Sequence, residues 1–125
     1  MDLADAAVEV ARLSRLLDAG LQAMRDMARE LADTEHAYRK GKAESWARCP
    51  NDPHGTKPSD KDWTSAKREA WVDGDTADLR RLRDLAENMA KAAYQSVRAR
   101  QTQISALQSL LKAHQAEAEF ARTAA

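Results

Sequence analysis

Aromatic residues and cysteine are scarce in this chain, and each shortage excludes a class of protein. One Phe, two Tyr and three Trp among 125 residues cannot fill a thick globular core, because large side chains supply most of the buried area. A single cysteine, Cys49, excludes an internal disulfide and favours a reducing, cytoplasmic setting. No segment approaches the roughly 18 consecutive apolar residues of a membrane span, so we expect no contact with a membrane.

What the chain does have is a regular row of large side chains in its first third. These residues recur every seven positions, which is two helical turns, and therefore share one stripe of one helix. The row consists of Leu3, Val10, Leu17, Met24, Leu31 and Tyr38. The spacing predicts a helix over about residues 2–47, capped by Asp2, with Gly20 and Gly41 as its two weak positions.

A second, less regular stripe follows in the C-terminal half, with steps of three, four or seven residues, which are again multiples of about 3.5. It consists of Leu82, Met89, Ala93, Val97, Ile104, Leu107, Leu111 and Ala118. Three prolines lie between the stripes and predict a loop over about residues 48–62. We expect a second helix over about residues 63–121, with residues 73–76 as candidates for a kink.

These patterns predict an all-α fold: one domain, residues 1–125, built as an elongated hairpin of two long amphipathic helices with coiled-coil-like seams. Alanine supplies much of the 43% hydrophobic content and buries little area, so a single copy would leave its stripes poorly covered. We therefore expect a homo-oligomer. Its predicted seam consists of Leu17, Met24, Leu31, Val97, Ile104 and Leu111.

Charge is balanced overall but unevenly distributed along the chain. Residues 1–38 carry eight acidic residues against four arginines, whereas residues 88–116 carry four basic residues and no acidic one. Two interpretations remain open: electrostatic pairing between the two helices, within or between copies, and a basic stripe that binds nucleic acid.

Basic and aromatic residues also alternate on both sides of the predicted loop. Basic side chains bind phosphates, and aromatic faces stack on unpaired bases. This pattern predicts a single-stranded nucleic-acid site, although a small aromatic core that closes the hairpin explains it as well. The candidate site consists of Tyr38, Arg39, Lys40, Lys42, Trp46, Arg48, Trp63, Lys67 and Arg68.

No pattern of catalytic residues is present. The three histidines have no recurring ligand spacing, and one Cys49–His54 pair falls short of the four ligands of a closed zinc site. A phosphate-binding glycine loop and a nucleophile motif are both missing. We therefore expect no enzyme activity, metal, cofactor or small-molecule substrate.

Several segments resemble small helical proteins encoded by phages of actinobacteria. The resemblance covers nearly the whole chain and lies in Ala37–Lys40, Trp46–Pro50, Gly55–Thr56, Lys67–Val72, Thr76–Arg80, Ser105–Gln108 and Ala118–Thr123. It implies a location in the host cytoplasm during infection. The order of elements also resembles, more distantly, phage recombination mediators of the UvsY type.

That second resemblance implies a ring-like homo-oligomer that binds single-stranded DNA and helps to load a RecA-type recombinase. Arg39, Lys40 and Lys42, with Tyr38 and Trp46 beside them, correspond to the DNA-contacting segment of that family. The proline-containing loop and the zero net charge depart from its pattern. Two alternatives stay open: an inhibitor that binds a defence or host protein through a helix face, and a structural coiled-coil component.

Overall fold

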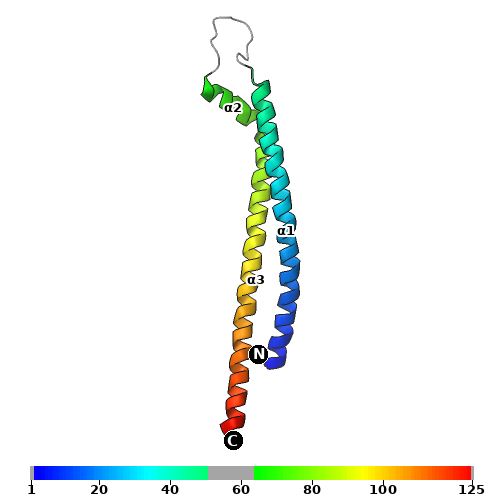
Figure 1. The fold of residues 1–125 in the computed structure, drawn as a ribbon, viewed down its shortest axis with the longest axis vertical. Coiled ribbons are helices and arrows are strands. Elements are labelled where there is room, and N and C mark those ends of the chain that lie inside the picture. Colours follow the sequence, from blue (N-terminus) through cyan, green and yellow to red (C-terminus); the bar gives the residue numbers. More distant parts are fainter. Residues whose placement is uncertain (1, 51–63, 125) are drawn as a thin grey trace, which may run out of the picture. The chain divides into compact units, whose positions relative to one another are not determined.

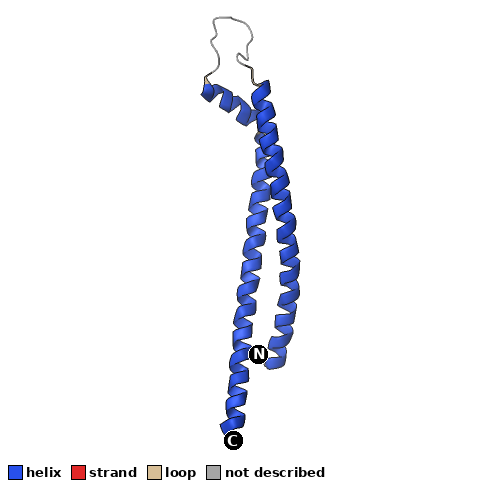
Figure 2. Ribbon diagram, viewed as in Figure 1, coloured by secondary structure: helices blue, strands red, loops and turns tan. Residues whose placement is uncertain are grey.

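The computed structural model describes residues 2–50 and 64–124, which form three helices and no strand (Figures 1 and 2). They are α1 (Leu3–Arg48), α2 (Ser65–Asp75) and α3 (Ala77–Ala124). The predicted all-α class is confirmed, and the two long helices, α1 and α3, pack against each other. Most of the predicted loop lies outside the described residues. No helix among the described residues is long and apolar enough to cross a membrane.

Helix α1 begins and ends close to where its sequence predicts. The Asp2 carboxylate accepts a hydrogen bond of 2.7 Å from the Asp5 backbone N–H, so it caps one of the free amides of the first turn. At the other end, the Cys49 N–H donates to the Trp46 carbonyl over 3.3 Å. Pro50 follows and has no N–H with which to extend the helix.

The helix predicted over residues 63–121 is present as two consecutive helices, α2 and α3, which meet at Thr76. Both the N–H and the hydroxyl of Thr76 donate to the Val72 carbonyl, over 2.9 and 2.7 Å. Val72 is fully buried and Thr76 is 2% exposed. The break therefore lies within the region suggested for a kink, where a buried pair of residues fixes it.

The chain divides into two compact units, and each contains a segment of α1 packed on a segment of α3. The first unit combines residues 1–27 with 90–125, and the second comprises residues 28–89. In the first, Ala6, Leu13, Val97 and Ile104 are buried. In the second, Tyr38, Val72 and Ala86 are buried.

The two glycines of α1 are positions of close helix packing, and α1 continues through both. A Cβ atom on Gly20 would lie 3.3 Å from Val97 Cγ2, and one on Gly41 would overlap with Leu79 Cδ1. Both glycines belong to a second row of residues on α1, which lies three positions after each member of the predicted row from Leu3 to Tyr38. The two rows together form the face of α1 that packs on α3. Glycine is therefore used here to let α3 approach closely.

The packed row of α3 differs at both ends from the predicted stripe. Leu82 and Met89 are 47% and 46% exposed, and Ala118 is exposed as well. The row actually alternates steps of four and three residues, which is the spacing of a coiled-coil seam. It consists of Leu79, Arg83, Ala86, Ala90, Ala93, Val97, Arg100, Ile104, Leu107 and Leu111.

Candidate nucleic-acid interface

Tyr38, the first aromatic residue of the predicted site, is buried rather than presented to a ligand. It is 8% exposed. The Arg83 guanidinium lies 4.7 Å from the centre of its ring, and Lys42 Nζ lies 5.8 Å from it. Both cations are thus held against the negative face of the ring. Tyr38 closes the packing of the second unit and leaves no face on which a base could stack.

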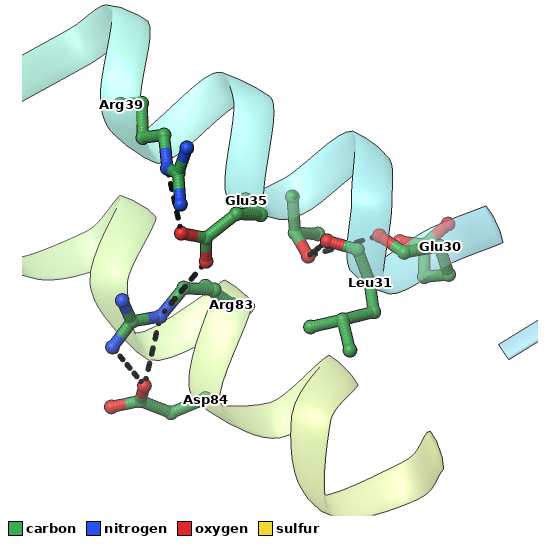
Figure 3. Close-up of polar contacts among 7 residues, drawn as sticks. Glu30, Leu31, Glu35, Arg39, Arg83 and Asp84 are labelled. Carbon is green, nitrogen blue, oxygen red and sulfur yellow. Dashed lines mark hydrogen bonds and ion pairs between the residues drawn. The ribbon is translucent and has the colours of Figure 1, made fainter. Parts of the chain in front are cut away.

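Arg39 and Arg83 share the carboxylate of Glu35 (Figure 3). Arg39 Nε donates to Glu35 Oε1 over 2.9 Å, and Arg83 Nε lies 3.6 Å from Glu35 Oε2. Arg83 also donates to Asp84 over 2.8 Å. The Arg39 side chain is 77% exposed, so its ion pair is weak and open to exchange with a phosphate.

At the α1–α2 junction, Trp46 and Arg48 each contact a residue of α2. The Arg68 guanidinium lies 5.4 Å from the Trp46 ring centre, and Trp46 is half-buried. Arg48 donates to Asp75 Oδ2 over 2.7 Å. Trp46 is therefore engaged by a cation of its own chain.

Asp75 is the carboxylate that pairs with Arg48 at this junction. The Ser45 hydroxyl and then the Arg48 guanidinium lower the pKa of the Asp75 carboxyl below its ordinary value. Ser45 is fully buried, and its hydroxyl has no hydrogen bond of good geometry. We therefore assign its effect on Asp75 to proximity rather than to an aligned hydrogen bond, and regard Arg48 as the structural partner.

Three lysines and one tryptophan complete the predicted site. Lys40 and Lys67 are exposed, and Lys42 is half-buried beside Tyr38. Trp63 lies outside the described residues. The structure thus brings predicted residues together in two pairs, Lys42 with Tyr38 and Arg68 with Trp46. Arg39 and Arg48 instead pair with acidic residues outside the predicted site. The sequence did not predict that Arg83 would contact Tyr38. Seams are identified from apolar residues, and Arg83 is a charged residue in the packed row of α3.

A different exposed aromatic residue lies on the stretch of α3 that has no acidic side chain. Tyr94 is 50% exposed, and its hydroxyl accepts a hydrogen bond of 3.2 Å from Arg98. The same guanidinium lies 5.8 Å from the ring centre. Tyr94 was missed as a candidate, although the absence of acidic residues from 88 to 116 was visible in the sequence.

Tyr94 and Arg98 line a groove of about 390 Å³ in the first unit, between α1 and α3. Leu21 and Met24 of α1 and Val97 of α3 give it apolar walls. Its polar lining comes from Arg98, Gln101, Thr102 and Ser105. We call this site the Tyr94 groove. It combines a cation, hydroxyl and amide groups, and an accessible aromatic ring.

A second groove, of about 360 Å³, lies in the same unit. Its lining includes Leu13 of α1 with Gln103, Ala106 and Leu107 of α3. At its edge, Arg12 forms an ion pair with Glu9, and this hydrogen bond lowers the pKa of the Glu9 carboxyl. Arg100 of α3 also lines this groove, which therefore has two cations and one carboxylate in its lining.

The residues predicted for the seam between copies lie on the packed faces of α1 and α3. In the first unit, Val97 and Ile104 are buried, whereas Leu17, Met24 and Leu111 are half-buried. Leu31, in the second unit, is half-buried as well. Contacts within one chain thus already use these side chains.

Within the described ranges, no three His, Cys, Asp or Glu side chains lie close enough together to hold a metal ion. The predicted weak pair falls partly outside these ranges, since Cys49 is described and His54 is not. No protein-family model, curated protein or solved structure matches this chain.

Proposed function

We propose that this chain is a non-enzymatic protein that binds single-stranded DNA, of the recombination-mediator type. The observation that carries the proposal is the Tyr94 groove, in which an exposed aromatic ring and a guanidinium lie on a helix stretch without acidic residues. Arg98 would contact phosphate, and the Tyr94 ring would stack on an unpaired base. Such stacking contributes about 1–3 kcal/mol per base.

The residues around the predicted loop take a secondary place in this proposal. Lys40 and Lys67 are exposed and can contact phosphates. Their aromatic neighbours are less accessible than Tyr94, since Tyr38 is 8% exposed and Trp46 is half-buried, so they would contribute little stacking. The strand would therefore depend on the Tyr94 groove for stacking and on both regions for charge.

The test is fluorescence anisotropy with a labelled single-stranded oligonucleotide and with the matching duplex, at low and moderate salt. Binding should favour the single strand, because stacking needs unpaired bases. Affinity should fall with salt by a logarithmic slope of about −0.7 for each phosphate contact. Absence of single-strand binding at low salt would overturn the proposal.

Four variants locate the site in the same assay. Tyr94→Ala should weaken binding by roughly tenfold, for the loss of one stacked base, and Arg98→Ala should weaken it through the loss of a phosphate contact. Arg15→Ala, an equal change of charge at an exposed position of α1, is the matched control and should bind like the parent. Alanine at Arg39, Lys40 and Lys42 together should flatten the salt slope without abolishing the preference for single strands.

The wider role is proposed on the resemblance alone. It comprises assistance to a RecA-type recombinase and a location in the host cytoplasm during phage infection, whereas self-association is also expected from the poorly covered apolar stripes. The second candidate is a protein-binding inhibitor or coiled-coil component, and the covering of Tyr38 and Trp46 by cations of the same chain favours it. Failure of the parent protein to bind the oligonucleotide would leave this second candidate.

A further inference from the structure

One face of α3 is exposed and carries no charge over about six helical turns, in a chain that is 32% charged. Its positions alternate steps of four and three residues, and all but the last lie one residue before a member of the packed row. We call it the neutral face. It consists of Ala92, Ser96, Ala99, Gln103, Ala106, Leu110 and Ala113.

This spacing is that of a second coiled-coil seam beside the one that α1 occupies. Leu110 is 54% exposed on it, although a leucine usually packs when it lies on a helical seam. Alanine at every seventh position, from 92 to 113, lets another helix backbone approach closely. Gln103 and Ala106 of the face also line the second groove, whose remaining lining includes Leu13 and the charged residues Glu9, Arg12 and Arg100.

We propose that the neutral face binds the neutral face of a second copy of this chain, with the two α3 helices antiparallel. Charge supports a copy as the occupant. Between residues 88 and 116 all charges are basic, so two copies repel each other along any charged face of this stretch and can approach closely only along the neutral one.

The antiparallel direction follows from side-chain size and from the charges at the two ends of α3. Pairing centred on residue 101 places Leu110 opposite Ala92 of the second copy, a large side chain against a small one. It also brings Glu117 and Glu119, near the end of α3, towards the level of Arg81, near its beginning. A parallel pair would instead align like charges and place Leu110 against itself.

The end of α3 supports the same arrangement. All residues from 112 to 124 are exposed, and Phe120 is 74% exposed. An isolated helical segment of this length is marginal in water. In the antiparallel pair, Phe120 comes to the level of Leu82, which is 47% exposed. Two poorly covered apolar side chains would then cover each other.

The first test is the mass of the full chain in solution without DNA, by sedimentation equilibrium, so that it is independent of the proposed DNA binding. We expect twice the 13.9 kDa of one chain. Ala99→Glu/Ala106→Glu places two charges in the face and should weaken association at least tenfold, while helicity by circular dichroism is retained. Ala4→Glu/Ala11→Glu, with the same spacing on exposed positions of α1, is the matched control and should associate normally.

The second test measures direction, with a spin label at Gln115→Cys in a Cys49→Ala background. In the antiparallel pair the two labels are 28 residues apart along the axis, which is about 42 Å. A parallel pair would place them side by side and overturn the proposed direction. If the parent protein is monomeric, the proposal is wrong, and the neutral face would instead be a binding surface for a different protein. A larger assembly supports it only if the charged variant lowers the mass.

Discussion

At the scale of single residues, the two glycines of α1 show how local propensity and packing oppose each other. Glycine costs a helix about 1 kcal/mol relative to alanine, and this cost made Gly20 and Gly41 appear as weak positions. Their contacts with Val97 and Leu79 supply the compensation, because α3 fits where a side chain would otherwise lie. The spacing of residues along α1 could not predict this close packing, because it does not specify which side chain of α3 lies opposite each glycine.

Gly41→Ala should therefore lower the free energy of unfolding by about 1 kcal/mol. The overlap with Leu79 Cδ1 costs about 1–3 kcal/mol as overpacking, against a gain of about 1 kcal/mol in helix propensity. The same change at Gly74, which has no atom within 4 Å of its added Cβ, should raise stability. Urea unfolding followed by circular dichroism measures both. Equal gains at the two positions would contradict the close packing at Gly41.

At the scale of elements, the helices and the place where the second one is interrupted were predictable, whereas the physical cause of the interruption was not. The row from Leu3 to Tyr38, together with the Asp2 cap, predicted both ends of α1 to within about one residue. The break between α2 and α3 has no proline, and Gly74 before it lies inside α2. It depends on the burial of Val72 and Thr76, which is a tertiary effect. For the same reason the exposure of Leu82 and Met89 on α3 escaped prediction.

Thr76→Val should destabilise the protein by about 1 kcal/mol. Valine keeps the shape but removes the buried hydroxyl that donates to the Val72 carbonyl over 2.7 Å, and such a bond contributes about 0.5–1.5 kcal/mol. Thr123→Val is the matched control, because its hydroxyl donates to the Glu119 carbonyl over 3.2 Å at an exposed position. Thermal unfolding should show a loss for the first variant and little change for the second. A similar loss in both would assign the effect to helix propensity.

At the scale of the whole molecule, the sequence predicted the class of fold better than the use of its surfaces. Two long helices that pack together follow directly from heptad spacing. The candidate DNA site was less predictable, because a basic and aromatic pattern does not distinguish side chains that face a ligand from those that face each other. Arg83 on Tyr38 and Arg68 on Trp46 are contacts between residues far apart in sequence, while the exposed Tyr94 lies among ordinary polar residues.

The packed and exposed rows of α3 should therefore respond differently to the same substitution. Val97 is 4% exposed and lies against Gly20, so Val97→Asp buries an unpaired carboxylate, at a cost of several kcal/mol. Against a typical stability of about 5–15 kcal/mol, this should remove most of the cooperative unfolding transition seen by circular dichroism. Gln101→Asp, four residues later at an exposed position, introduces the same side chain into the same helix and should keep the transition. If both variants unfold alike, helix propensity rather than packing of α1 on α3 holds the first unit together.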